Sequence, residues 1–204
     1  MKARNQLQKK ELNVVKSIRS KQKTTPVTHL AELFKTKLKT LYWLERELVK
    51  VIPKVIKNTR SIELVSALEI HLVVTKDQTK RLDAIFKSIN VFPERQKCAS
   101  ASGLIKQLND EFDSTAETMV RDAGIIVSMQ QIIHHTIVLY DSLCSFAKIF
   151  NEYEAAALLA DAMEEEKKTD IDLSQIAETF INPAAAGVYR HDNVVTLQSK
   201  ILFN

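Results

Sequence analysis

Length, composition and charge exclude several classes of protein before any motif is considered. The chain has 204 residues but only three glycines and four prolines, whereas a β-sandwich or a doubly wound sheet of this length usually needs many more turn residues. No apolar run is long enough to span a membrane, and the N-terminus lacks the apolar segment of a secretory signal. We therefore expect an all-α protein of the cytoplasm that has no membrane partner.

The N-terminal residues carry most of the positive charge. Residues 1–24 contain eight basic side chains and one acid, a net charge of +7, while the rest of the chain carries a net charge of −3. We expect residues 1–24 to form a basic, disordered arm. Such an arm could bind the phosphates of a nucleic acid. It has no aromatic residue to stack on bases and the remaining chain is acidic, so this partner is not the expected one.

The first predicted helix spans residues 28–58 and has a regular core-facing stripe. Its members recur in alternating steps of four and three residues, which places them on one helical face. They are Phe34, Leu38, Leu41, Glu45, Leu48, Ile52 and Val55. Pro53 either kinks this helix or ends it early.

A second helix is predicted over residues 62–90, after a short turn. Its stripe consists of Val65, Leu68, Leu72, Thr75, Thr79, Leu82 and Phe86, flanked by His71 and Gln78. Residues 91–113 then break the pattern with a proline, a glycine and several polar residues. This connection is long enough to cross the length of a bundle, and it can contain a short helix near residues 101–108.

The third and fourth helices are predicted over residues 115–149 and 152–181. Asn182-Pro183 should end the fourth helix, and residues 183–204 should form an appended tail. Short loop, long loop and short loop is the connectivity of a ferritin-like antiparallel four-helix bundle. We therefore predict this fold for residues 28–182, with the crossover between the second and third helices.

Three carboxylates fall on the predicted core stripes. They are Glu45, Glu166 and Asp170, and each must be paired, protonated, solvated or bound to a cation, because an unpaired carboxylate in an apolar core is costly. Counting from the two hairpin turns places Glu45 and Glu166 at mid-height, about 22 Å from each turn. His71 lies near the same level. The sequence thus predicts an incomplete metal site formed by Glu45, His71, Glu166 and Asp170.

Each of these residues, taken singly, has a simpler interpretation that is favoured over metal binding. Glu166 and Asp170 could pair with Lys167 or with a basic residue of a neighbouring helix, and His71 could be a satisfied histidine at the edge of the core. The coincidence of several such residues at one level of the bundle is what favours the metal site.

Ordered segments of the chain also match those of a known family. They are residues 41–48 (LYWLEREL) with Ile52-Pro53-Lys54, then His71-Leu72, Thr75 and Arg81-Leu82, then Lys97-Cys98 and Gly103-Leu104-Ile105, then Arg121-Asp122-Ala123, Gln130, His134 and Tyr140, and finally Leu158-Leu159, Glu165-Glu166-Lys167 and Asp170. In this order they resemble the YciE/YciF-type bacterial ferritin-like proteins over residues 30–182. The resemblance implies a ferritin-like bundle, often dimeric, that is linked to bacterial stress responses and has carboxylates and histidines able to bind iron or manganese. No defined catalytic activity comes with it.

The chain departs from the family pattern where further ligands would be expected. The family has a Glu-His-Tyr-Glu run in its third helix, but residues 133–136 are Ile-His-His-Thr, in which positions 133 and 136 face the core and 134 points away. The acid that the family places before Thr75 is Val74 here. A di-metal carboxylate site uses about four carboxylates and two histidines. We therefore predict a degenerate site that binds Fe or Mn weakly or not at all, and no catalysis.

Two other functions and one partner are kept open. The chain could be a di-iron or manganese carboxylate protein with ferroxidase-like or peroxidase-like activity, or a protective protein that associates with DNA through residues 1–24. A homodimer is expected because the third helix is apolar over a wide arc, from Ile125, Ile132 and Leu139 round to Ile137.

Overall fold

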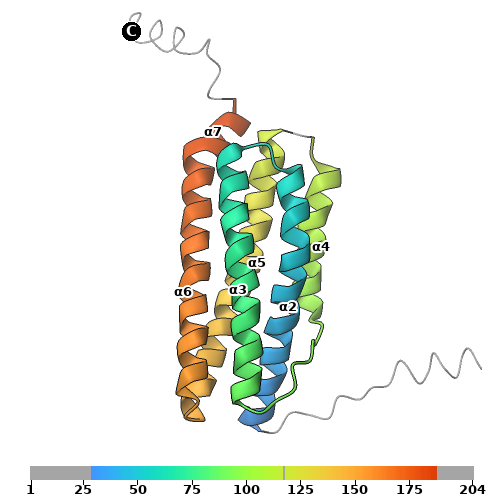
Figure 1. Cartoon of the computed structure of the whole chain (residues 1–204). Helices are drawn as coiled ribbons and strands as arrows, with labels where there is room; N and C mark the ends of the chain where they lie inside the picture. Colours follow the sequence, from blue (N-terminus) through green and yellow to red (C-terminus); the bar gives the residue numbers. More distant parts are fainter. Residues whose placement is uncertain (1–28, 117, 188–204) are drawn as a thin grey trace, which may run out of the picture.

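A computed structural model describes residues 29–116 and 118–187, in which four long helices and one shorter helix form a bundle. The long helices are α2 (Leu30–Asn58), α3 (Ile62–Ser88), α5 (Met119–Ile149) and α6 (Tyr153–Ile176), and α4 (Ala99–Ser114) lies in the crossover (Figure 1). No strand occurs in the described part of the chain. The predicted arm (residues 1–24) and all but the first few residues of the predicted tail (183–204) lie outside the described residues.

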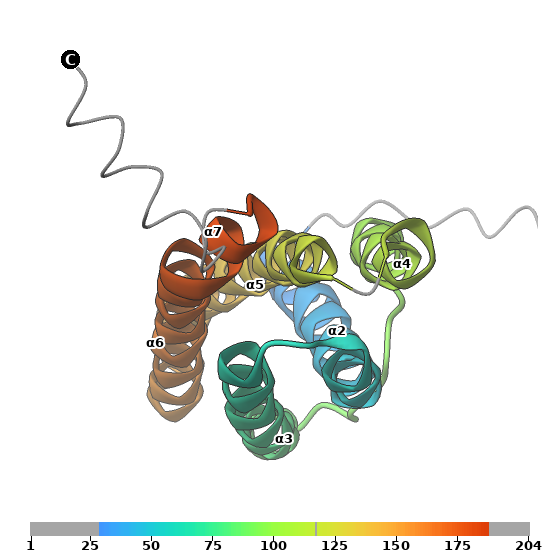
Figure 2. The same cartoon turned by 90° about the horizontal axis from the view of Figure 1, so that it is seen from above.

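The four long helices form an antiparallel bundle. Helices α2 and α6 run in one direction and α3 and α5 in the other, so that each packs against two antiparallel neighbours (Figures 1 and 2). The predicted stripe of α2 is confirmed, because all seven of its members are buried. Pro53 does not end α2 early, since the helix continues to Asn58.

Helix α4 is longer than the short helix predicted from the sequence, and it covers the outer side of α5. Its buried Ala101 and Leu108 share a core cluster with residues of α5. Ile125 and Ile132 are buried in this same cluster, and Leu139 is buried in the other half of the core. The apolar face that was expected to form a dimer interface is therefore not free. The homodimer stays a prediction, without this surface to support it.

The inward face of α3 differs from the predicted one by a small rotation. Leu64 rather than Val65 is buried, and Leu72 is only half-buried. His71 and Gln78, expected at the edge of the stripe, are fully buried. Sequence hydrophobicity placed the stripe on the apolar residues, but the two polar side chains turn inward because they contact a carboxylate of α6.

The end of α6 also differs from the prediction. Asn182-Pro183 does not stop the chain's helical path, because a π-helical turn (η1, Ala177–Ile181) leads directly into α7 (Asn182–Ala185). Pro183 lies in the first turn of α7, where the fixed φ of proline suits a helical backbone. The described bundle therefore extends beyond residue 182.

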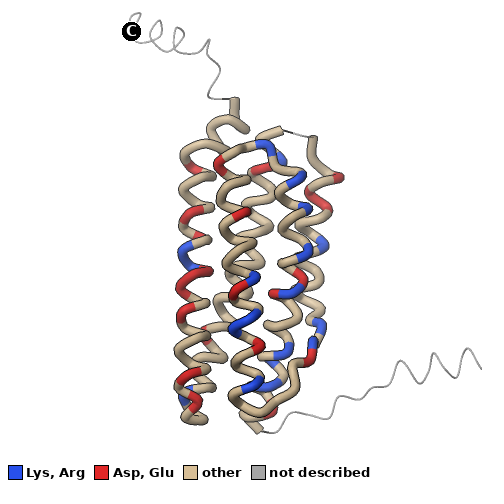
Figure 3. Tube along the Cα trace, viewed as in Figure 1, with Lys and Arg blue, Asp and Glu red and all other residues tan. Residues whose placement is uncertain are grey.

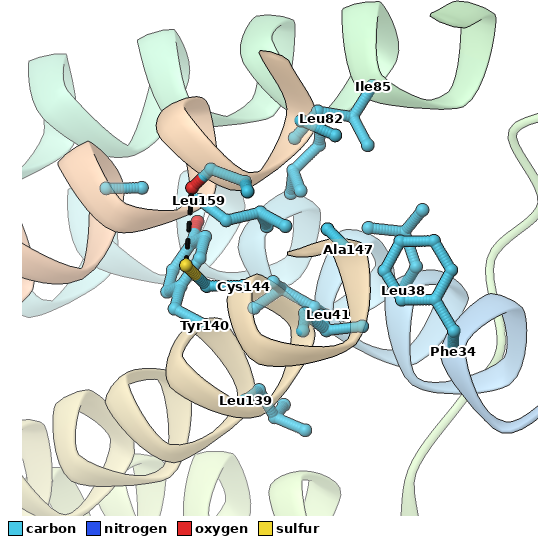
Figure 4. Packing of buried hydrophobic residues seen from close by; sticks show 14 of the residues in the cluster. Phe34, Leu38, Leu41, Leu82, Ile85, Leu139, Tyr140, Cys144, Ala147 and Leu159 are labelled. Carbon is cyan, nitrogen blue, oxygen red and sulfur yellow. Dashed lines mark hydrogen bonds between the residues drawn. The ribbon is translucent and has the colours of Figure 1, made fainter. Parts of the chain in front are cut away.

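The apolar core is divided into two halves. One half contains Phe34, Leu41, Leu82 and Tyr140, with Leu159 from α6 (Figure 4). The other half is built around the second part of α2, the start of α3, the first part of α5 and the end of α6. Polar residues occupy the level between these two apolar halves.

Helix α5 is, among the described helices, the one that is long and apolar enough to cross a membrane by length and composition. Half of its most apolar window is buried inside the bundle. A core helix of a bundle has this pattern as well.

Helices α2 and α6 carry net charges of opposite sign. Helix α2 carries seven basic and three acidic residues, whereas α6 carries seven acidic residues and two lysines. Blue positions accordingly predominate on α2 and red positions on α6 in Figure 3. The α6 side of the bundle is therefore the side that attracts cations.

Candidate functional site

A layer of buried polar side chains crosses the bundle at mid-height. We call it the central layer, and it comprises Glu45 of α2, His71 and Gln78 of α3, Thr136 and Tyr140 of α5, and Glu166 of α6. Each of these side chains is at most 1% exposed. All four long helices contribute to it, so residues far apart in the sequence meet here because the bundle is antiparallel.

Glu166 is the best-partnered member of the central layer. Gln78 donates an amide hydrogen bond to its Oε1 at 3.0 Å, and the Thr136 hydroxyl donates to its Oε2 at 3.2 Å. His71 Nε2 lies 3.5 Å from Oε1, within ion-pair distance but without hydrogen-bond geometry. Counting residues from the second hairpin turn predicted that Glu166 lies level with Thr136, and the hydrogen bond between them confirms this prediction.

Glu45 has a poorer environment. The Tyr140 hydroxyl donates to Glu45 Oε1 at 3.0 Å, while Glu45 Oε2 is buried without a partner. Burial, followed by the negative charge of Glu166, raises the pKa of Glu45 well above its ordinary value, although the Tyr140 hydrogen bond acts in the opposite direction. Burial and the nearby Glu45 also raise the pKa of Tyr140.

The pKa of Glu166 shifts the other way. Burial alone would raise it, but the charge of His71 and the hydrogen bonds from Gln78 and Thr136 outweigh burial, so the pKa of Glu166 is lowered. Two carboxylates in one layer thus favour different protonation states. The native structure favours the acid form of Glu45 and the ionised form of Glu166.

Several atoms of the central layer that could bind a metal ion lack a hydrogen-bond partner. They are Glu45 Oε2, both ring nitrogens of His71 and Gln78 Oε1. Carboxylate, imidazole and amide oxygen are ligand types that suit Fe(II) and Mn(II). Among residues 29–116 and 118–187, however, no group of three or more His, Cys, Asp or Glu side chains is arranged to hold an ion.

Asp170 does not lie in the central layer, although it was predicted together with Glu45, His71 and Glu166. Its carboxylate accepts a hydrogen bond from Gln130 at 2.9 Å and lies 3.2 Å from His134 Nε2. The side chain of His134 is 65% exposed and that of Asp170 is 21% exposed. The structure therefore brings together three of the four predicted ligands and places Asp170 at the bundle surface, where it pairs with the outward-pointing His134.

Two of the three positions that lack family acids, Ile133 and Thr136, face the centre. Ile133 and Thr136 are fully buried, and Val74 is half-buried. A carboxylate at 133 or 136 would therefore point into the bundle, but the side chains present are an alkyl group and a hydroxyl that is already used for hydrogen bonds to Ile133 O and Glu166. The central layer therefore offers two carboxylates and one histidine, fewer ligands than a di-metal carboxylate site uses.

The sequence did not predict that hydrogen bonds connect Gln78 to side chains nearer the surface. Gln78 Nε2 also donates to Glu165 Oε2 at 3.2 Å, and Arg81 donates to the same oxygen of Glu165. Arg81 and Glu165 occur in the segments that resemble the family, but their spacing on two separate helices gave no signal that they meet. Only the rotation of α3 brings Gln78 between Glu165 and Glu166.

Comparisons with known proteins agree with this architecture. Residues 29–186 match the family described as Domain of unknown function (DUF892). The protein YciF of Escherichia coli (strain K12) is 33% identical over 157 residues, which cover 76% of this chain and 95% of YciF.

Solved structures show the same fold. The crystal structure of the E. coli stress protein YciF matches with a TM-score of 0.73 and 32% identity, over 76% of this chain and 99% of that one. YcfI from Rhodopseudomonas palustris matches with a TM-score of 0.72 and 26% identity, over 76% of this chain and 98% of that one. Together with the family match, these similarities confirm the resemblance seen in the sequence, and the chain belongs to the DUF892 family of YciF-type helical-bundle proteins.

Proposed function

We propose that this protein is a stress-associated helical bundle of the bacterial cytoplasm whose central layer binds at most one divalent metal ion, weakly, and performs no redox catalysis. The observation that carries the proposal is the central layer itself. It contains two carboxylates and one histidine, where a di-metal site uses about four carboxylates and two histidines.

The stress association rests on the relatives. YciF of E. coli is described as a stress protein, and it is similar to this chain over nearly the whole of its own length. Residues 29–186 carry that similarity. We extend the association with stress, but no reaction, to this chain.

The limit of one ion rests on the contacts of the two carboxylates. Both oxygens of Glu166 already accept hydrogen bonds, and Glu45 favours its acid form. An ion that bridged Glu45, His71 and Glu166 would have to displace the proton of Glu45 and would use the partnerless atoms of Glu45 and His71. Fe(II) and Mn(II) are the ions expected from this donor set. A second ion would lack the carboxylates that positions 74, 133 and 136 do not supply.

Metal content per chain tests the proposal. The protein is loaded anaerobically with Fe(II) or Mn(II), desalted and measured by mass spectrometry, beside Glu45→Ala/Glu166→Ala and its isosteric counterpart Glu45→Gln/Glu166→Gln. A matched control changes a partly exposed and an exposed neighbour on the same two helices, Glu47→Ala/Glu164→Ala. We expect no more than one ion in the wild type and the control, and none in the central variants. Two ions per chain, with oxygen-dependent oxidation of the iron, would overturn the proposal.

A further inference from the structure

One chain of polar contacts leads from the buried Glu166 to solvent. Gln78 donates to Glu166 at 3.0 Å and to Glu165 at 3.2 Å. Gln78 is fully buried, whereas the Glu165 side chain is 38% exposed. In the described residues, the central layer's side-chain contacts at Thr136, Tyr140 and His71 stay between buried groups. The Gln78–Glu165 contact between α3 and α6 instead links the layer to a partly exposed side chain.

Arg81 closes this route from the outside. Its guanidinium pairs with Glu165 across the α3–α6 interface and with Asp77 at 3.3 Å on its own helix. The Arg81 side chain is only 18% exposed, so its charge is weakly screened by solvent. The Arg81 charge acts on both Glu45 and Tyr140. A cation that approached Glu166 past Glu165 would meet the positive charge of Arg81.

We infer that Gln78, Arg81 and Glu165 form a gate through which a divalent cation exchanges with the central layer. Glu165 is the outer carboxylate that first receives the cation, and Arg81 both holds Glu165 in place and repels the cation. Gln78 separates the outer carboxylate from the inner one and must move aside for the cation to pass. The acidic surface of α6 supplies the field that draws cations to this side (Figure 3).

The inference rests on the proposed function only in naming a divalent cation as the species that passes. The gate itself makes a separate claim about access, which can be read without any metal. His71 touches the same oxygen of Glu166 as Gln78 does and is 1% exposed. If the gate opens, His71 becomes accessible to a small reagent.

Two variants change the charge of the gate in opposite ways. Arg81→Gln removes the repelling charge, and Glu165→Gln removes the receiving carboxylate. Lys80→Gln and Glu164→Gln are matched controls, because each makes the same charge change at the neighbouring position on a more exposed side chain. Mn(II) uptake is followed by stopped-flow mixing, using the quenching of protein fluorescence. We expect uptake roughly three- to tenfold faster in Arg81→Gln and slower by a similar factor in Glu165→Gln, with both controls like the wild type.

The second readout is modification of His71 by diethyl pyrocarbonate, mapped by peptide mass spectrometry against the exposed His134 of the same molecules. Both gate variants break the ion pair that closes the route, so both should raise the relative rate at His71, by about tenfold, while the controls should not. Opposite effects on uptake with equal effects on labelling are the expected signature.

The outcomes separate the gate from the proposed function. If metal binds but neither uptake nor His71 labelling distinguishes Arg81→Gln from Lys80→Gln, the gate is wrong and the metal site stands. If no variant takes up metal, the His71 labelling rate alone tests the gate. Faster labelling in both gate variants would then support opening of the route at Gln78, Arg81 and Glu165 while the proposed metal binding fails, and unchanged labelling would overturn the gate as well.

Discussion

The Tyr140 hydroxyl donates a hydrogen bond to one oxygen of Glu45 at 3.0 Å, and the second oxygen of the same carboxyl is buried without a partner. This asymmetry means that Glu45 is stabilised on one side and left unsatisfied on the other. The pKa of Glu45 is raised by burial and by the charge of Glu166, so the native state binds a proton here more tightly than the unfolded chain does. Several consequences for stability can be measured on the metal-free protein.

Glu45→Gln should stabilise the protein at pH 7. The folded pKa of Glu45 is raised, so its contribution to stability is present below the unfolded pKa of about 4.3 and is lost as pH rises toward the folded pKa. An amide keeps the acceptor for Tyr140 and carries no charge. We expect the free energy of unfolding in urea, measured in chelator, to rise by about 1–2 kcal/mol at pH 7 and the gain to shrink toward pH 4. The partly exposed Glu47→Gln serves as control, and a loss of stability in Glu45→Gln at pH 7 would contradict the raised pKa.

Glu166→Gln should have the opposite effect. The folded pKa of Glu166 is lowered, so its contribution is present above the unfolded pKa and is lost as pH falls through the folded pKa. The substitution removes the ion-pair partner of His71 and one acceptor in the layer. We expect a loss of about 1–3 kcal/mol in urea unfolding at pH 7, which narrows as the pH falls below about 4. An equal loss at pH 3 and pH 7 would show that ionisation of Glu166 does not contribute.

Asp122→Ala should destabilise the α2–α3 turn. The buried Asp122 carboxylate accepts backbone N–H groups of Arg60 at 3.1 Å and of Ser61 at 2.7 Å. Removal of the carboxylate takes the acceptor from the buried Ser61 N–H and the partly buried Arg60 N–H, at a cost of about 2–3 kcal/mol in the free energy of unfolding. Asp122→Asn keeps one acceptor oxygen and should lose less. The exposed Asp110→Ala, measured in the same urea titration, should change stability by less than about 0.5 kcal/mol.

The sequence predicted the fold well where hydrophobic spacing was unambiguous. The stripe of α2 was predicted in full, and Glu45 was placed inside the bundle because it interrupts an otherwise apolar series. The stripe of α3 was predicted less accurately, because Thr and Val occur on both sides of it. Only tertiary contacts turn His71 and Gln78 inward, because Glu166 on another helix is their partner.

Other parts of the site could not be read from periodicity. Asp170 lies four residues after Glu166 on the predicted stripe, yet it faces Gln130 and His134 at the edge of α5. A spacing of four residues turns a helix by about 40° beyond a full turn, and at the edge of a stripe this is enough to move a side chain from the core to the surface. The length of α4 and its position over α5 depend likewise on contacts between distant segments.

Asp170→Asn should leave metal binding unchanged if the central layer alone forms the site. Asp170 is partly exposed and contacts Gln130 and His134 rather than Glu45 or Glu166. We expect the affinity for Mn(II), measured by isothermal titration calorimetry, to stay within about twofold of the wild type. His134→Ala is the companion variant and should behave in the same way. A loss of binding in Asp170→Asn would return this residue to the site.

We propose above all that the central layer has ligands for at most one divalent ion. Equilibrium Mn(II) binding, with free Mn(II) counted by electron paramagnetic resonance, tests this claim most directly because weakly held ions are not lost to desalting. We predict saturation at no more than one ion per chain in the wild type and no binding in Glu166→Gln. Saturation at two ions, with both lost in Glu45→Gln or Glu166→Gln, would contradict the account and would indicate a working di-metal site.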